Sequence, residues 1–196
     1  TMATHQEQSL STKKKLSASL KKLMQAYDFH KISINMLVGD AHLNRNSFYY
    51  HFNNIFDLLK YTFEDDTTHI INQTNPSRNL KKTIYLIMDY LDQNKAFCTC
   101  AYQSLGKTEL RKFLKNNFQG IIIDTINHVT EKNHLRVSGD FKKYVVYSHT
   151  ELMTIHIIGY LENNFKFTKE QTADYMLSMF YSSVTTALEI ANTNNL

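Results

Sequence analysis

The sequence predicts an all-α protein, and three observations lead to that fold class. Apolar residues recur three, four and seven positions apart through most of the chain, which is the spacing of one face of an α-helix. The 196 residues include one proline and five glycines, too few for the closely spaced turns of a β-sandwich or barrel. Alternation at period two, the pattern of a half-buried strand, is not found in the sequence.

Composition limits the size of the folded domains and the cellular location of the chain. With 42% apolar residues it can bury a sizeable core, as one large helical domain or as a small domain beside a larger one. No apolar run approaches the roughly 18 residues of a membrane span, and no secretion-signal pattern opens the sequence. We therefore expect a cytoplasmic protein without a membrane partner.

Positive charge is concentrated at the N-terminal end. Residues 1–60 hold eight Lys or Arg and four acidic residues, and so carry the whole net charge of +4. A basic segment favours a polyanionic partner, although a solvated surface explains an excess of this size equally well. The first nine residues are polar and are expected to fray.

Caps and breakers predict where the helices begin and end. Thr12, Ser33 and Asn44 are placed to cap helices, and Thr168 with Gln171 three residues later forms a capping box. The expected helices cover about 12–27, 33–41, 44–52, 55–74, 78–94, 95–105, 107–133, 139–163 and 168–193.

Asn75-Pro76-Ser77 is the clearest linker signal. Pro76 cannot sit in a helix interior, and it biases Asn75 towards an extended backbone. We place the domain boundary there. The expected organisation is a first domain over 10–60, a connecting helix over 55–74, and a larger domain over 76–196.

Residues 44–52 read Asn-Arg-Asn-Ser-Phe-Tyr-Tyr-His-Phe and form the second of two short helices separated by a tight turn. That arrangement is the helix-turn-helix plan, in which the second helix reads base edges in the major groove. The Asn44 cap leaves backbone N–H groups facing outward, where a phosphate can dock. Arg45 can pair bidentately with guanine, and Asn46 with adenine.

The aromatic residues of this helix divide by face. Phe48 and Phe52 lie four apart and should pack inward, whereas Tyr49 and Tyr50 should face the duplex and bond to phosphates. An aromatic satellite core in an ordinary helical bundle is the alternative, and the pattern alone does not separate the two.

Residues 33–52, followed by Asp57-Leu58-Leu59, resemble the DNA-binding domain of TetR-family transcriptional regulators. The resemblance covers about residues 10–60, and spacing, caps and aromatics agree together. The phenylalanine, tyrosine and histidine pattern also resembles a branch that includes activators of dihydroxyacetone kinase operons. The matching positions are Ser33 at the cap of the first short helix, Ala41 and Leu43 in the turn, Asn44 at the second cap, and Tyr49 and Phe52 as the closing aromatics.

The resemblance implies an all-α homodimer that binds a double-stranded DNA operator. It implies a ligand-binding C-terminal domain that dimerises through its last two helices, with a small molecule or a protein as effector and no cofactor or metal. The residues expected to contact DNA are Ser33, Asn44, Arg45, Asn46, Ser47, Tyr49, Tyr50, His51 and Lys60.

Three positions depart from the family pattern. His42 stands in the turn where the family usually has Gly, at a position that often needs a positive φ. Asn46 replaces a small residue and adds a base-reading side chain. Ile55 stands where many members have a phosphate-binding Lys, and Lys60 or Lys31 is the candidate to compensate.

The C-terminal segment offers weaker signals. Small residues in the last helix, among them Ser182, Ser183 and Thr186, would let a partner helix approach closely, although both last helices can instead close the monomer core. An apolar pocket with a few polar groups is expected among residues 78–160, and plain core packing is the alternative. Its candidate lining residues are Tyr85, Met88, Phe97, Tyr102, Phe118, His149, Met153 and His156.

Enzyme classes find little support. The sequence has no phosphate-cradling glycine loop, no His-Glu-x-x-His motif and no Glu-x-x-His repeats on facing helices. Cys98-Thr99-Cys100 is a lone pair of thiols, for which burial is favoured over a metal or redox site. The sequence therefore predicts a DNA-binding regulator, with a helical protein-interaction module that binds little DNA as the alternative.

Overall fold

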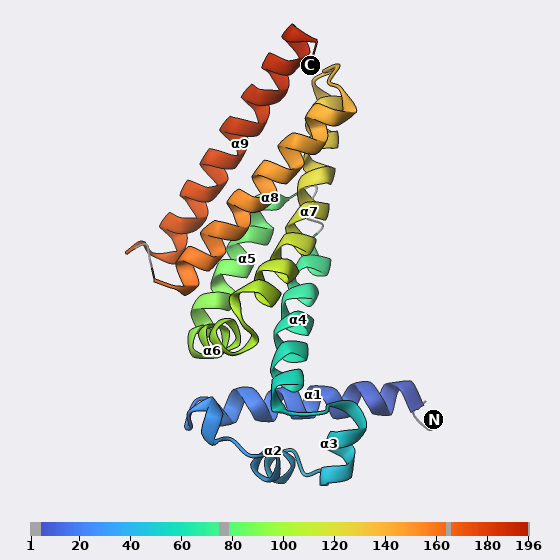
Figure 1. Cartoon of the computed structure of the whole chain (residues 1–196), viewed down its shortest axis with the longest axis vertical. Coiled ribbons are helices and arrows are strands. Elements are labelled where there is room, and N and C mark those ends of the chain that lie inside the picture. Colours follow the sequence, from blue (N-terminus) through green and yellow to red (C-terminus); the bar gives the residue numbers. More distant parts are fainter. Residues whose placement is uncertain (1–4, 75–78, 164–165, 196) are drawn as a thin grey trace. The chain divides into compact units, whose positions relative to one another are not determined.

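The computed structural model describes residues 5–74, 79–163 and 166–195, and within these ranges the chain folds into nine α-helices and one 3₁₀ turn, without a strand (Figure 1). The prediction of an all-α fold is confirmed. The expected linker Asn75-Pro76-Ser77 lies outside the described residues. None of the helices described is long and apolar enough to cross a lipid bilayer.

The helices group into two compact units. The first comprises Thr1–Asp66 and Lys95–Gly106, and the second comprises Thr67–Asn94 and Lys107–Leu196. This grouping divides the helix over residues 55–74 and assigns the helix over 95–105 to the first unit. The expected boundary at residues 75–77 therefore does not coincide with the division between the units.

The first unit contains a three-helix arrangement built around α1, α2 and α3, which pack on one another. Its fully buried side chains include Leu16 and Leu20 of α1, Leu37 of α2 and Phe48 of α3. The elements of this unit are α1 (His5–Leu23), a 3₁₀ turn (Phe29–Lys31), α2 (Ile34–Asp40), α3 (Arg45–His51), the first part of α4 (Ile55–Thr74) and α6 (Lys95–Leu105).

The expected start of the first helix at Thr12 was wrong. The helix already includes His5, and the Thr12 hydroxyl donates to the Gln8 carbonyl 3.0 Å away, as a mid-helix threonine does. No Gly or Pro interrupts residues 5–12, and Glu7 favours a helix N-terminus through the helix dipole. The expected end at Tyr27 was also wrong, because α1 ends at Leu23 and residues 24–27 form a turn.

The second unit is a helical bundle in which α7 packs on α8, and α9 packs on both α8 and α5. The predicted capping box is present: the Thr168 hydroxyl accepts from the Gln171 N–H at 3.2 Å, and the Gln171 side chain accepts from the Thr168 N–H at 3.0 Å. Its helices are the last part of α4, then α5 (Leu80–Gln93), α7 (Lys107–Lys132), α8 (Gly139–Leu161) and α9 (Lys169–Asn194).

A hydrogen bond ties the end of α8 to α5. The Tyr160 hydroxyl donates to Asp92 Oδ1 at 2.9 Å, and the side chain is only 8% exposed. Burial, together with the Asp92 carboxylate, raises the pKa of Tyr160 to about 12. The folded chain therefore holds this proton more tightly than the unfolded chain, so this stabilisation is complete below about pH 10 and is lost as the pH rises towards 12.

We expect Tyr160→Phe to lower the free energy of unfolding by about 1 kcal/mol at neutral pH, because one hydrogen bond is lost. Between pH 10 and 12 the stability of the native chain should fall more steeply than that of the variant. Urea unfolding across this range measures both effects. Tyr144→Phe, at an exposed position of the same helix, is the control and should behave as the native chain does.

Candidate nucleic-acid interface

Side-chain caps fix the two short helices of the first unit. The Asn44 Oδ1 atom accepts from the Ser47 N–H at 2.8 Å and from the Ser47 hydroxyl at 3.1 Å, and so begins α3. The Ser33 hydroxyl accepts from the Met36 N–H at 3.3 Å and begins α2. Both predicted caps are confirmed. Ser47 is thereby folded back onto its cap, and Arg45 and Asn46 are left exposed.

The turn between α2 and α3 needs a left-handed residue. His42 has φ 54°, and the next residue, Leu43, donates its N–H to the Val38 carbonyl at 2.8 Å, which closes the turn. The expectation of a positive φ at this departure from the family pattern is confirmed. A residue with a Cβ atom is strained in this region by roughly 1–2 kcal/mol, most of all when it is β-branched.

Substitutions at His42 should follow this strain. We expect His42→Val to lower the free energy of unfolding by about 1–2 kcal/mol, and His42→Gly to leave it unchanged or raise it slightly. Thermal unfolding of the two variants measures the difference. Equal stability of both would show that the left-handed conformation of this turn does not limit the fold.

The exposed face of α3 presents a compact polar and aromatic group. An Arg45 Nη2 atom donates to the Tyr49 hydroxyl at 3.3 Å, and the guanidinium carbon lies 5.8 Å from the centre of the Tyr49 ring. Tyr49 is 48% exposed and Tyr50 67% exposed. This face therefore offers an oriented guanidinium and two phenol groups to a partner.

The opposite face of α3 holds the helix in place. Phe48 and Phe52 are buried, and their ring centroids are 5.9 Å apart. The predicted division of the aromatics, two inward and two outward, is confirmed. Burial of Phe48 and Phe52 fixes which way Arg45 and the two tyrosines point.

The C-terminal end of α3 lies beside the first turns of α1, which sequence reasoning had not placed in the helix. Tyr50 and His51 stand edge to face, with ring centroids 4.9 Å apart, and His51 is half-buried. They line a small hollow of about 140 Å³ together with Gln8, Ser9 and Thr12. The signal that could have found this contact is that residues 5–12 contain no Gly or Pro, so α1 can begin at His5 and reach Tyr50 and His51.

The lysines of the first unit differ in their partners. Lys60 is half-exposed and lies 4.0 Å from Glu64, and Lys31 lies 3.4 Å from Asp28. Lys21 pairs with Asp66. Lys14 and Lys15 are exposed on α1, so their ammonium groups are available to a polyanion. Carboxylates therefore offset part of the positive charge that the sequence concentrates here.

The eight residues predicted to line an effector pocket are divided between the units. Phe97 and Tyr102 are buried on α6 in the first unit, and the other six belong to the second. The His149 ring lies 2.8 Å from both the Val145 carbonyl and the Ser183 hydroxyl, which links α8 to α9. The remaining members are Tyr85, bonded to Asp174, His156, bonded to the Leu152 carbonyl, and the buried Met88, Phe118 and Met153.

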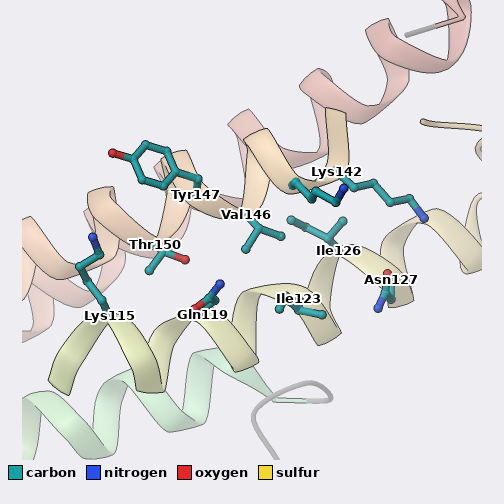
Figure 2. Close-up of a pocket in the computed structure, with 10 residues that line it drawn as sticks. Lys115, Gln119, Ile123, Ile126, Asn127, Lys142, Val146, Tyr147 and Thr150 are labelled. Carbon is teal, nitrogen blue, oxygen red and sulfur yellow. The ribbon is translucent and has the colours of Figure 1, made fainter. Parts of the chain in front are cut away.

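A pocket of about 450 Å³ lies between α7 and α8 (Figure 2), and none of the eight residues lines it.

The two cysteines lie on α6. Cys98 is buried and Cys100 half-buried, and burial raises the pKa of the Cys100 thiol. Within the described ranges, no group of three or more His, Cys, Asp and Glu side chains could hold a metal ion.

The last two helices expose an apolar surface, which we name the α8–α9 strip. On α9, residues four, eleven and fifteen positions after Tyr175 lie on one side, and Met179 and Ile190 there are each about half exposed. Ser183 and Thr186 are exposed between these apolar side chains. The strip consists of Tyr144, Ile155, Tyr175, Met179, Ser183, Thr186 and Ile190.

Comparison with known proteins gives a consistent picture. The TetR model described as the transcriptional regulator C-terminal region matches residues 78–182, more than half of the chain. The HTH-type dhaKLM operon transcriptional activator DhaS of Lactococcus lactis subsp. lactis (strain IL1403) is 32% identical over 91 residues. That match covers 46% of this chain and 49% of the relative, so it spans about half of the relative's length.

Two solved structures share the fold. The dihydroxyacetone kinase operon activator DhaS superposes with a TM-score of 0.74 at 20% identity, over 88% of this chain and 96% of that one. A protein described as a TetR-family transcriptional regulator from Syntrophomonas wolfei str. Goettingen superposes with a TM-score of 0.62 at 16% identity, over 88% and 94% of the two chains.

Proposed function

The chain belongs to the TetR family of transcriptional regulators, and on that premise we propose that it binds a specific DNA operator as a homodimer under the control of an effector. The operator would be pseudo-palindromic, because a two-fold symmetric dimer presents two copies of α3. Operator binding requires a cytoplasmic location. The name of the Lactococcus relative supports activation as the sign of regulation.

The exposed face of α3 is the observation that carries this proposal. Arg45 and Asn46 stand in its first turn with the donor groups that read guanine and adenine, while Phe48 and Phe52 hold the helix against the unit's core. Tyr49 and Tyr50 are exposed residues, and their phenol groups are suited to phosphate oxygens. Ser47 and His51 are half-buried, so we assign them supporting contacts.

Phosphate contacts would come mainly from lysines. Lys14 and Lys15 are exposed on α1, and Lys31 and Lys60 pair with Asp28 and Glu64, carboxylates that are themselves exposed or half-exposed. Each phosphate that a lysine neutralises releases counterions and steepens the dependence of affinity on salt. We propose that these lysines take over from the family's phosphate-binding lysine, whose place Ile55 occupies.

Dimerisation is proposed through the α8–α9 strip. Its exposed apolar side chains lie on the two helices through which TetR-like proteins are expected to pair, and its serine and threonine residues allow close helix approach. A ligand bound in the second unit would then alter how the two copies of α3 are spaced, and so alter operator affinity.

Selection of bound duplexes from a random DNA pool tests the proposal, using the purified chain and then measuring the affinity of the selected sequence at several salt concentrations. We expect an inverted-repeat consensus and a log–log salt slope of about −0.9 for each phosphate contact. Lack of enrichment, together with a shallow slope, would contradict the proposal. It would favour a helical module controlled by a protein partner.

A further inference from the structure

The strongest unassigned feature is the pocket between α7 and α8. Its volume of about 450 Å³ lies in the range of ~300–1,000 Å³ that small-molecule sites occupy. Ile123, Ile126 and Val146 form an apolar middle. Figure 2 shows Lys115 and Thr150 towards one end of this apolar middle, and Asn127 and Lys142 towards the other. A ligand here would meet polar groups at both ends of an apolar body.

Two of the three lysines that line the pocket already have carboxylate partners. Lys115 pairs with Glu151, and its ammonium lies 5.8 Å from the centre of the Tyr147 ring. Lys143 lies 2.9 Å from Asp140. The Lys115 ammonium and the Arg111 guanidinium lower the pKa of the Glu151 carboxyl, which keeps this acid charged and the pair intact at neutral pH.

Lys142 is the pocket cation without an acidic partner in the part of the chain that the structure describes. Its ammonium lies 3.3 Å from the Thr130 hydroxyl oxygen. That hydroxyl directs its own proton to the carbonyls of its helix, at 3.0 Å from Ile126 and 2.9 Å from Asn127. A half-buried ammonium with one neutral acceptor would bind an anionic group more strongly than a neutral one.

Thr150 provides a second, independent observation. Its side chain is 4% exposed, and among the described residues its hydroxyl is the buried side-chain polar atom that lacks a hydrogen-bond partner. Two other buried threonines do bond to the carbonyl four residues earlier in their own helix. Thr154 on α8 donates to the Thr150 carbonyl at 2.8 Å, and Thr125 on α7 donates to the Ile121 carbonyl at the same distance. An unbonded buried hydroxyl destabilises a fold, so this one indicates a missing partner in the pocket.

We propose that the α7–α8 pocket binds a small amphipathic anion. Its carboxylate or phosphate pairs with Lys142, its aliphatic body packs on Ile123, Ile126 and Val146, and a polar group at its far end bonds to the Thr150 hydroxyl. Lys142 and Thr150 are eight residues apart on one helix, roughly 12 Å along the axis, which a chain of about eight carbons spans.

That this anion is the effector rests on the proposed function. That the pocket binds the anion does not depend on the proposed function. The pocket and the α8–α9 strip share α8, since Val146 and Thr150 face the pocket and Tyr144 and Ile155 belong to the strip. A ligand that changes how α8 packs on α7 would therefore act on the proposed dimer surface. That link gives the pocket a route to operator affinity.

Titration calorimetry of the full chain with four eight-carbon probes tests the ligand class. The probes are octanoate, octyl phosphate, 8-hydroxyoctanoate and the neutral 1-octanol. We expect saturable binding of at least one anion, at least tenfold tighter than that of 1-octanol, and tighter binding of 8-hydroxyoctanoate than of octanoate. The carboxylate and phosphate arms tell which head group the pocket takes. Anions that bind no better than 1-octanol would overturn the proposal.

Variants assign the contacts. Lys142→Met should weaken the anionic probes about tenfold and leave 1-octanol unchanged, and Lys112→Met, at an exposed α7 lysine outside the pocket, should change neither. Thr150→Val should abolish the preference for 8-hydroxyoctanoate while raising the melting temperature, because it removes a hydroxyl without a partner. Thr154→Val, which removes a bonded hydroxyl, should lower the melting temperature.

Binding that is insensitive to Lys142→Met would overturn the proposal, and so would a fall in melting temperature for Thr150→Val. The operator measurements are separate from these. Anion binding without any DNA enrichment would leave the pocket assigned and the regulatory function refuted, and enrichment without anion binding would do the reverse. Anion binding that leaves operator affinity unchanged would assign the pocket and refute its effector role.

Discussion

Replacing Arg45 and Tyr49 together with alanine should abolish specific operator binding while the chain stays folded. A bidentate contact from arginine to guanine discriminates by about 1–3 kcal/mol, and a dimer makes it twice, so we expect a fall of at least thirtyfold in affinity for the selected operator. The fold should survive because both side chains are exposed, and the core loses only the edge-to-face contact of the Tyr49 ring with Phe48. Fluorescence anisotropy with the selected duplex measures the affinity, and circular dichroism checks the fold.

The matched control is Tyr27→Ala, which removes a tyrosine of nearly the same exposure, 49% against 48%, away from α3. This control should bind the operator as the native chain does. Unchanged binding by the Arg45→Ala/Tyr49→Ala variant would refute the assignment of α3 as the reading helix. A loss of binding in Tyr27→Ala as well would point to a general effect on the first unit.

The single variants carry further information, because Arg45 and Tyr49 interact. The hydroxyl of Tyr49 accepts from the guanidinium and so orients it. We expect Tyr49→Phe to weaken operator binding less than Arg45→Ala, and the two effects to be non-additive in a double-mutant cycle. A tyrosine that contacts only phosphate would instead give additive losses.

Helix α3 and the turn before it were predictable from the sequence because the residues that determine them are neighbours along the chain. An Asn or Ser at a helix N-terminus, whose side chain accepts from the N–H three residues later, can be recognised from the sequence, as at Ser33 and Asn44. The four-residue spacing of Phe48 and Phe52 likewise identifies the buried face. These features depend on neighbours along the chain, so one sequence suffices to find them.

The rest depends on contacts between distant residues. The α7–α8 pocket exists because Ile123 and Val146 come together from different helices, and no periodicity within either helix reveals that. Aromatic and methionine side chains such as Phe118 and Met153 suggested a pocket wall but are buried in the core. The grouping of α6 with the first unit also depends on contacts between distant residues, because the composition of a short helix does not show which unit it packs in.

Replacing Met179 with glutamate should convert the proposed dimer to a monomer. Met179 is 53% exposed on the α8–α9 strip, so in the proposed symmetric pairing its replacement would bury two carboxylates, one from each subunit, in an apolar interface. Two like charges brought into an apolar interface cost several kcal/mol. We expect sedimentation velocity to show a monomer, and operator affinity to fall at least tenfold because one subunit reaches a single half-site.

A glutamate placed on another side of α9 tests whether Met179→Glu acts on dimerisation or on folding. Ser178 is exposed one residue before Met179 and points roughly 100° away around the helix, so Ser178→Glu introduces the same charge outside the strip. This control should remain dimeric and bind the operator normally. Ile190→Glu, three turns further along the same strip, should reproduce the monomer. A dimer that persists in both Met179→Glu and Ile190→Glu would exclude the α8–α9 strip as the interface, and would require the two copies of α3 to be held at their half-sites by another surface of the second unit.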